Sequence, residues 1–202
     1  MRILLVLSLS ICLLFSMSTI ASADIFRITP EISNATLETG DIDESGNVYS
    51  LSGELNFVVV RTGVDLASGE FGDYEYTMAG VRIGTELPLI FFKLIAFGGY
   101  QTYEFDFENS PTIEVKGSVL GVGLEKELNN FFSLRGVALV PVDMEIKDSN
   151  EEIDFSSVKL DLIFTTAPLI DFFVGYRALK IDGESSDELD LSGFAAGVRI
   201  GI

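Results

Sequence analysis

Side chains that commonly carry enzyme chemistry are scarce in this sequence. Its 202 residues include no histidine and no tryptophan, and the single cysteine, Cys12, lies in an apolar stretch near the N-terminus. Acidic runs at 148–152 and 187–190 could be imagined as acid/base couples, but no nucleophile accompanies them and both fall in predicted loops. We interpret these runs as solvated charge. The sequence therefore predicts no catalytic site, no cofactor and no dedicated metal site.

The N-terminal residues have the organisation of a secretory signal. A basic start at Arg2 precedes an apolar stretch over 3–15, and a small-residue cleavage site occupies 21–23. We expect a signal peptide over 1–23 and one mature domain over 24–202. An uncleaved anchor helix is the alternative, because the apolar segment is nearly long enough to span a bilayer. Cleavage would remove the cysteine, so the mature chain could form neither a disulfide nor a thiolate metal site.

The chain is strongly acidic and yet apolar on average. It has 31 Asp and Glu against 13 Lys and Arg, a balance that disfavours nucleic acid as a partner. Its mean hydropathy is nonetheless +0.38. A protein with both properties must separate charged from apolar residues, either by face or by end.

Apolar and polar residues alternate with a period of two along the mature chain, and no stretch keeps the helical period. The fold class is therefore all-β. The hexapeptide at 79–84 recurs at 196–201, which is typical of strands that run the same way through the same medium. The last strand is the clearest, because one face is small or charged and the other carries Phe194, Ala196, Val198, Ile200 and Ile202.

Two kinds of connection alternate along the chain. Tight turns each precede a phenylalanine pair at 86–92, 127–132 and 167–173. The other connections are polar, acidic and often longer, and we place them at 39–47, 68–73, 108–111, 147–154 and 182–188. Short turns at one end and acidic loops at the other indicate a sheet with two unlike ends.

A turn near Asn56 decides the number of strands. The segment 54–61 could be a single strand, but it parallels 127–135, which contains a turn. With that turn, an antiparallel up-and-down barrel of ten strands leaves both termini at the short-turn end, as in bacterial transmembrane barrels. Without it there would be nine strands, or eight plus an N-terminal extension. The expected ten strands cover 25–38, 48–55, 57–67, 74–87, 91–107, 112–128, 131–146, 155–166, 171–181 and 188–202.

One face of the predicted strands combines charge with glycine. Its arginines lie out of phase with the large apolar residues around them, and glycines such as Gly121 and Gly197 share their phase. Glycine weakens a solvent-facing strand, whereas a narrow lumen needs small residues between large charged ones. A soluble, periplasmic lipocalin-like binder with its apolar face inward is the alternative. We place the aliphatic face against lipid and predict a lumen charge network of Arg27, Glu31, Glu54, Arg61, Asp65, Arg82, Glu86, Glu125, Arg135, Lys159, Asp161, Arg177 and Arg199.

Phenylalanine pairs beside the short turns favour an aromatic girdle at one membrane interface. Packing in a β-sandwich core is the alternative, but the fixed place of these pairs beside turns argues against it. Possible partners along the wall or at the other rim are Tyr49, Tyr74, Tyr76, Tyr100 and Tyr103. The predicted girdle comprises Phe91, Phe92, Phe131, Phe132, Phe172 and Phe173.

In these features the chain resembles the small bacterial outer-membrane β-barrels, the group that includes the OmpA transmembrane region, OmpX and OmpW. The resemblance covers essentially all of 24–202 and lies in the pattern of strands and turns. It implies export to the outer membrane of a Gram-negative bacterium. The last strand resembles the signal that the family's barrel assembly machinery recognises, although Ile202 stands where an aromatic residue is usual. This signal would use Phe194, Val198, Ile200 and Ile202.

Two functions fit such a membrane barrel. Arginine and carboxylate should pair in a low-dielectric tube, so we expect a plugged lumen and a structural or surface-interaction role. The same charges could instead line a narrow porin-like path for ions or small solutes. Enzymatic outer-membrane barrels place a histidine in their catalytic groups, and this chain has none. Expected partners are outer-membrane lipids, lipopolysaccharide and the assembly machinery, with weak binding of divalent cations at the acidic loops.

Overall fold

The computed structural model describes residues 25–40, 42–57, 59–107, 110–147, 151–167, 169–183 and 188–202. The signal peptide predicted at 1–23 lies outside these residues. Within the described ranges, no helix is long and apolar enough to cross a membrane.

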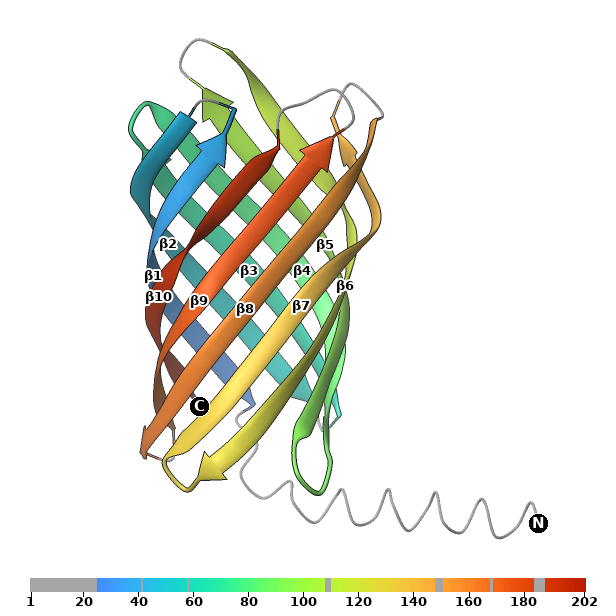
Figure 1. The fold of residues 1–202 in the computed structure, drawn as a ribbon. Coiled ribbons are helices and arrows are strands. Elements are labelled where there is room, and N and C mark those ends of the chain that lie inside the picture. Colours follow the sequence, from blue (N-terminus) through green and yellow to red (C-terminus); the bar gives the residue numbers. More distant parts are fainter. Residues whose placement is uncertain are drawn as a thin grey trace, which may run out of the picture.

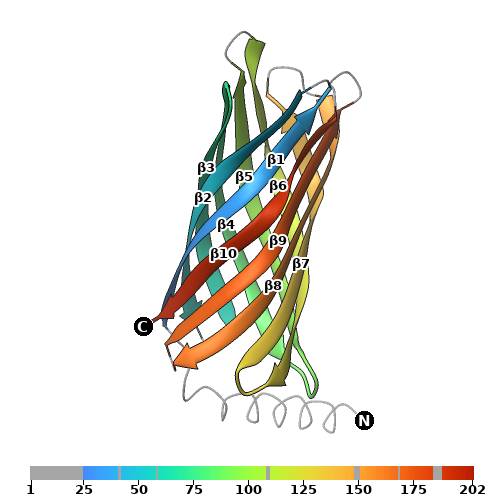
Figure 2. The same cartoon turned by 60° about the vertical axis from the view of Figure 1, so that its left-hand side comes forward.

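Ten antiparallel strands form a closed barrel, in which each strand pairs with its chain neighbours and β1 pairs with β10. Figures 1 and 2 show these strands tilted steeply around a single tube. The predicted ten-stranded up-and-down barrel is confirmed, and the alternatives of nine strands or eight plus an extension are wrong. The strands are β1 (Phe26–Thr39), β2 (Ile42–Phe57), β3 (Val60–Phe71), β4 (Tyr74–Pro88), β5 (Lys93–Phe107), β6 (Ser110–Asn129), β7 (Phe132–Ile146), β8 (Glu151–Ala167), β9 (Ile170–Gly183) and β10 (Leu189–Gly201).

The barrel closes between its first and last strands. Ile28 lies opposite Ile200 in the β1–β10 ladder, and the backbone N–H of Ile25 donates to the carbonyl of Ile202 at 3.0 Å. Both ends of the described chain therefore lie at the same end of the tube, where Figure 1 marks the C-terminus. An even number of up-and-down strands requires this arrangement.

Connections at this end are tight, as predicted. β2 ends at Phe57 and β3 begins at Val60, so a turn does follow Asn56. Between β6 and β7, Asn129 Oδ1 accepts hydrogen bonds from the backbone N–H groups of Phe131 and Phe132 at 2.8 and 3.0 Å. Asparagine readily holds a turn in this way, which explains why β6 reverses here.

Two of the predicted acidic loops are instead largely strand. β2 begins inside the loop predicted at 39–47, and β3 continues through most of 68–73. Gly40 and Gly72 form the turns with φ of 55° and 60°, a conformation that glycine adopts without steric cost. The acidic residues expected in loops therefore stand on the barrel wall. Their low strand propensity is outweighed by pairing around a packed interior.

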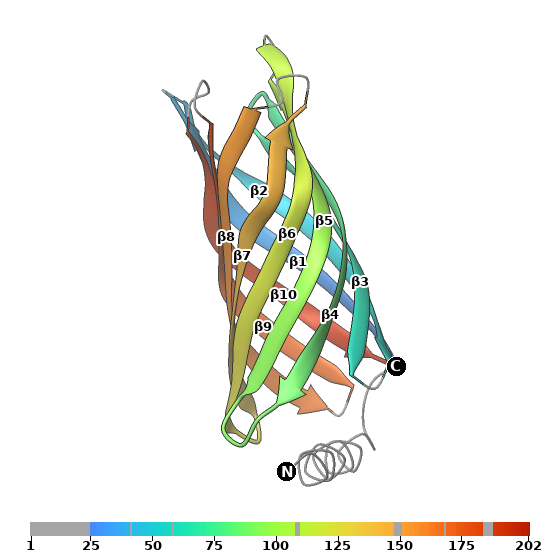
Figure 3. The same cartoon turned by 90° about the vertical axis from the view of Figure 1, so that its right-hand side faces the viewer.

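Strands that adjoin the other predicted loops are also longer than expected. β6 begins at Ser110 and β8 at Glu151, although parts of the loops predicted at 108–111, 147–154 and 182–188 lie outside the described residues. β6 is 20 residues long. Figure 3 shows β5 and β6 reaching past the neighbouring strands at the end opposite the short turns. The barrel is therefore taller than the sequence predicted.

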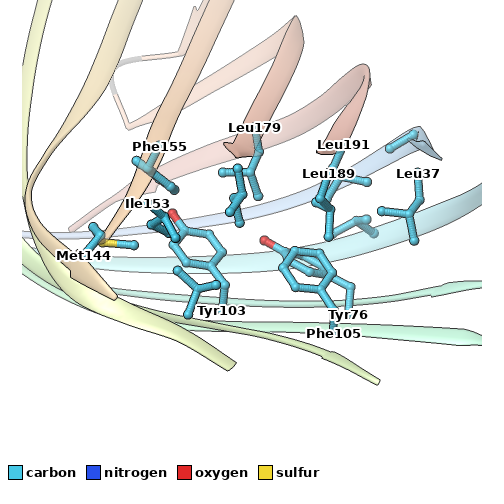
Figure 4. Close-up of a cluster of buried hydrophobic side chains, with 14 of the residues drawn as sticks. Leu37, Tyr76, Tyr103, Phe105, Met144, Ile153, Phe155, Leu179, Leu189 and Leu191 are labelled. Atoms are coloured by element: carbon cyan, nitrogen blue, oxygen red, sulfur yellow. The ribbon is translucent and has the colours of Figure 1, made fainter. Parts of the chain in front are cut away.

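The interior changes character along the barrel axis. At the short-turn end, which we call the network half, inward side chains are mostly charged and include Glu54, Arg82 and Arg199. At the opposite end, the core half, inward side chains are apolar and pack together (Figure 4). Buried residues of this core half are Ala35, Leu37, Val48, Phe71, Tyr76, Tyr103, Phe105, Val115, Val119, Leu139, Met144, Ile153, Phe155, Leu179, Ile181, Leu189 and Leu191.

The outer wall changes in the opposite sense. On β4, Val81 and Ile83 face outward with 56% and 59% of their surface exposed, beside the network half. Further along the same face, Thr77 and Glu75 are exposed beside the core half. The predicted orientation, with charge inside and aliphatic residues outside, therefore holds for the network half and is wrong for the core half. The apolar band around the network half is the surface suited to lipid.

Candidate lumen site

Strands β2, β3 and β4 bring the first group of lumen charges together, because every second residue of a strand points inward. Arg82 Nη2 lies 2.7 Å from Glu54 Oε1. The same guanidinium pairs through Nη1 with Asp65, which also accepts a hydrogen bond from Ser52 Oγ at 2.6 Å. Arg82 therefore joins carboxylates from two other strands, and charged hydrogen bonds of this kind are stronger than neutral ones.

Further ion pairs extend this group around the wall. Arg61 Nη1 lies 2.7 Å from Glu86 Oε1, and Arg135 reaches Glu86 and Glu125 at 3.8 Å each. Lys93 Nζ donates to Glu125 Oε1 at 3.0 Å. Charges from β3 to β7 are thus linked. Arg27 joins the group from β1, with Nη1 at 3.9 Å from Glu54 Oε2.

A second group crosses the seam where the barrel closes. Arg177 on β9 holds Glu31 on β1 through two bonds, Nε to Oε1 at 3.0 Å and Nη2 to Oε2 at 2.6 Å. Its Nη1 lies 2.7 Å from Asp161 Oδ1. Asp161 Oδ2 in turn accepts a hydrogen bond from Arg199 Nη2 at 3.2 Å. This group therefore ties β1 to β8, β9 and β10.

Every residue of the predicted lumen network points into this half of the barrel, and every one except Lys159 makes an ion pair within the described part of the chain. Lys159 borders the lumen cavities instead. Lys93 belongs to the network although the sequence reasoning missed it. Its signal was available, because Lys93 directly follows a short turn and lies opposite Glu125 in the ladder.

Phe173 corrects the predicted girdle. It points into the lumen, is 2% exposed, and lies beneath the guanidinium groups of Arg177 and Arg199, with the carbons Cζ at 5.6 and 5.3 Å from its ring centre. Phe172 and Phe173 are consecutive in a strand, so they must face opposite sides. Phe172 is the outward member, at 47% exposed.

The remaining girdle residues lie at the short-turn end and away from the lumen. Phe91 and Phe131 occupy turns and are 78% and 66% exposed, and Phe92 is 39% exposed. Phe132 packs edge to face on Phe164 of the next strand, with ring centres 5.2 Å apart. These positions suit a membrane interface, where aromatic rings are favoured.

Two of the tyrosines suggested as girdle partners are instead inside the core half. Tyr76 and Tyr103 are 5% and 3% exposed, whereas Tyr49 and Tyr100 face outward. Tyr103 Oη donates to Gln101 Oε1 at 2.5 Å, which satisfies the polar atom of a buried ring. The sequence reasoning missed this core. Its signal was the alternation of aromatic and acidic residues at 103–107, which places aromatic side chains on the lumen face.

The last strand presents its predicted apolar face outward. Phe194 and Ile202 are 76% and 71% exposed, Ile200 is 39% exposed, and Val198 is half-buried on the same face. Phe194 contacts Tyr176 on β9 edge to face at 5.7 Å. Recognition of this strand by an assembly machinery stays a prediction.

Cavities follow one another along the lumen of the network half. A polar vestibule of about 390 Å³ lies at the short-turn mouth and is bordered by Lys93, Asn129 and Arg199. Arg199 also borders a cavity of about 120 Å³. A third cavity, of about 80 Å³, lies between Lys159 and the buried Tyr103. Among the described residues, no group of three metal-ligating side chains could hold a metal ion.

No protein-family model and no curated protein sequence matches this chain. Solved structures do match it. Neisserial surface protein A (NspA) is 14% identical with a TM-score of 0.50, over 88% of this chain and 97% of that one. The outer membrane protease OmpT from Escherichia coli is 10% identical with a TM-score of 0.61, over 90% and 98%. A bacterial polysaccharide outer membrane secretin is 11% identical with a TM-score of 0.51, over 87% and 69%.

These similarities are similarities of fold, because the sequence identities are low. A closed antiparallel barrel with an outward apolar band is one of the few structures that can span a membrane, since all its backbone groups are paired. The fold, which the chain shares with these outer-membrane proteins, and the outward apolar band are those of a membrane-spanning antiparallel β-barrel. The protease activity in the name of OmpT is not carried over to this chain at 10% identity.

Proposed function

We propose that the protein is a closed, non-catalytic barrel in the outer membrane of a Gram-negative bacterium, with a structural or surface-interaction role. The observation that carries this proposal is that two different layers close the lumen in succession. Ion pairs bridge the wall in the network half, and apolar side chains fill the core half. The apolar layer by itself would obstruct a barrel of this size, because an interior of eight to ten strands is nearly filled by side chains.

The apolar layer is the stronger argument against a pore. Phe71 and Val115 have no exposed surface, and Phe105 is 1% exposed, although all three lie on the axis side of the wall. A hydrated ion would have to lose its water to pass such side chains. Closure of this kind favours a protein that acts through its surface.

The surface available for such a role is the acidic wall of the core half. Glu70, Glu104 and Asp154 are exposed on it, in a chain of net charge −18. This wall extends beyond the apolar band, where it would meet the environment and neighbouring lipopolysaccharide. Weak divalent bridging between these acids and lipid phosphates is part of the proposal, and calcium should then raise the unfolding temperature in detergent.

Planar bilayers test the closure. The purified mature barrel should give no stepwise conductance, and neither Arg82→Gln nor Arg199→Gln should create any, because the core half remains intact. Steps in the wild type that change in these variants would overturn the proposal in favour of a narrow channel. The vestibule at the short-turn mouth is the observation that favours that alternative.

A further inference from the structure

Lys159 is the one predicted lumen charge that the network leaves aside. It lies on β8, half-buried, and borders both the cavity of about 120 Å³ and the cavity of about 80 Å³. Within the described residues, its ammonium group makes no hydrogen bond and no ion pair, unlike the neighbouring Arg177 and Arg199. A cation in this position needs an explanation.

The strand register places a second cation next to Lys159. Lys159 lies directly opposite Arg177 in the β8–β9 ladder, and both side chains face the lumen. Like charges in directly opposite positions destabilise a sheet. Arg177 is already neutralised by Glu31 and Asp161, and Asp161 is shared with Arg199. Three cations therefore share two carboxylates at this point, so one positive charge is unmatched.

The surroundings make an unmatched charge costly. The outward neighbours of Lys159 on its own strand are Val158 and Leu160, which are 38% and 48% exposed on the apolar band. Lys159 thus lies at the depth of lipid, with the apolar core half beginning next to it. Charges in such low-dielectric positions are normally paired.

We propose that the cavity beside Lys159 binds one compact monovalent anion, either chloride or a small carboxylate. The ammonium supplies up to three donors. The same cavity is bordered by the hydroxyls of Ser33, Ser50 and Ser157 and by the Arg177–Glu31 ion pair, in which the carboxylate is already neutralised. Apolar side chains, including Tyr103 and Leu179, complete the lining of the cavity. This mixture suits a weakly hydrated single charge and disfavours sulfate, which carries two charges and a larger shell of water.

Size and access agree with such a ligand. One water molecule needs about 10–15 Å³ of cavity. The cavity of about 80 Å³ beside Lys159 therefore admits a chloride or an acetate with a few waters. The cavities shrink from about 390 to 120 to 80 Å³ between the short-turn mouth and Lys159. An anion entering from the mouth would therefore end at the lysine, beneath the apolar closure. The site does not depend on the surface role proposed above.

The test uses the full mature barrel in detergent micelles, at constant ionic strength set by sodium gluconate. Adding wild-type protein should broaden the ³⁵Cl NMR line of chloride. Replacing gluconate by chloride should raise the unfolding temperature of the protein until the site is saturated. Acetate should displace the broadening if a small carboxylate shares the site. In Lys159→Met both effects should vanish, and the variant should be more stable than wild type in gluconate, because the unmatched cation is gone.

Two further variants keep the result interpretable. Lys180→Met removes an exposed lysine from the outer wall of the neighbouring strand and should keep the full chloride response. Lys159→Arg keeps the positive charge and should keep part of the chloride response. Each variant is first shown to be folded by its heat-shifted gel mobility. The proposal is overturned if chloride broadening persists in Lys159→Met, or if wild-type protein responds to neither chloride nor acetate, which would mean a cavity filled by water only.

Discussion

The two halves of the barrel use the same ten strands but place opposite chemistry inside. In the network half the outer wall is apolar and the lumen is charged. In the core half the outer wall is acidic and the lumen is packed with aromatic and aliphatic side chains. Burial of apolar surface stabilises a structure only where the alternative is water. The outer wall of the network half faces lipid instead of water, so its apolar side chains can stay on the outside. The outer wall of the core half faces water, so its apolar side chains pack inside, as in a soluble protein.

Deleting a core side chain should have the largest effect. Phe105 is 1% exposed, and Phe105→Ala should lower the free energy of unfolding by about 3–5 kcal/mol, the usual cost of removing a packed phenylalanine. Phe194→Ala is the matched control, because Phe194 is 76% exposed on the lipid side. Urea unfolding in lipid vesicles, followed by circular dichroism, measures both. Equal losses would show that the core half is not packed as described.

Placing a charge on the wall should have the next largest effect. Val81→Arg puts a guanidinium in the apolar band of β4 and should cost about 2–4 kcal/mol near the membrane midplane. Thr77→Arg lies on the same face of the same strand, beside the core half, and should be nearly neutral in the same vesicles. The comparison between halves fails if Arg is tolerated equally at both positions.

Much of this organisation could be predicted from the sequence, and the missing part has a physical cause. The number of strands could be predicted from the turn after Asn56. The lumen position of residues such as Arg82 and Glu54 could be predicted because charged residues keep the same inward phase of the strand alternation along the chain. The core half did not follow, because its strands carry acids such as Glu70 and Glu75 on the outer face. Acidic residues next to glycine indicate a loop when each segment is considered alone. Only the pairing of these segments around a filled interior shows that they form strands.

Two finer errors share a different cause. Phe172 and Phe173 were both assigned to the girdle from their place after a turn, although adjacent strand residues cannot face the same side. Lys159 was assigned to the network from its phase alone. Phase predicts which side of the wall a residue faces, but it does not predict whether a partner lies within reach.

Removing one carboxylate from the network half should have an intermediate effect. Asp65 is 4% exposed and binds both Arg82 and Ser52. Asp65→Asn should lower the free energy of unfolding by about 1–3 kcal/mol, because it weakens bonds to a buried guanidinium that water cannot replace. Arg82 keeps Glu54 as a partner, which limits the loss. A change within error in vesicle unfolding would mean that the network contributes little to stability.

The smallest effect should come from an ion pair on the acidic wall. Lys180 Nζ donates to Glu188 Oε1 at 2.5 Å, closer than most pairs in the lumen. Both side chains are about half exposed, at 46% and 54%, so water replaces the bond when it breaks and salt screens the charges. Glu188→Gln should therefore leave the unfolding midpoint unchanged, although it breaks a contact shorter than most of those in the lumen. If Glu188→Gln and Asp65→Asn cost the same, burial would not determine the value of an ion pair, and the two halves would not differ as their packing indicates.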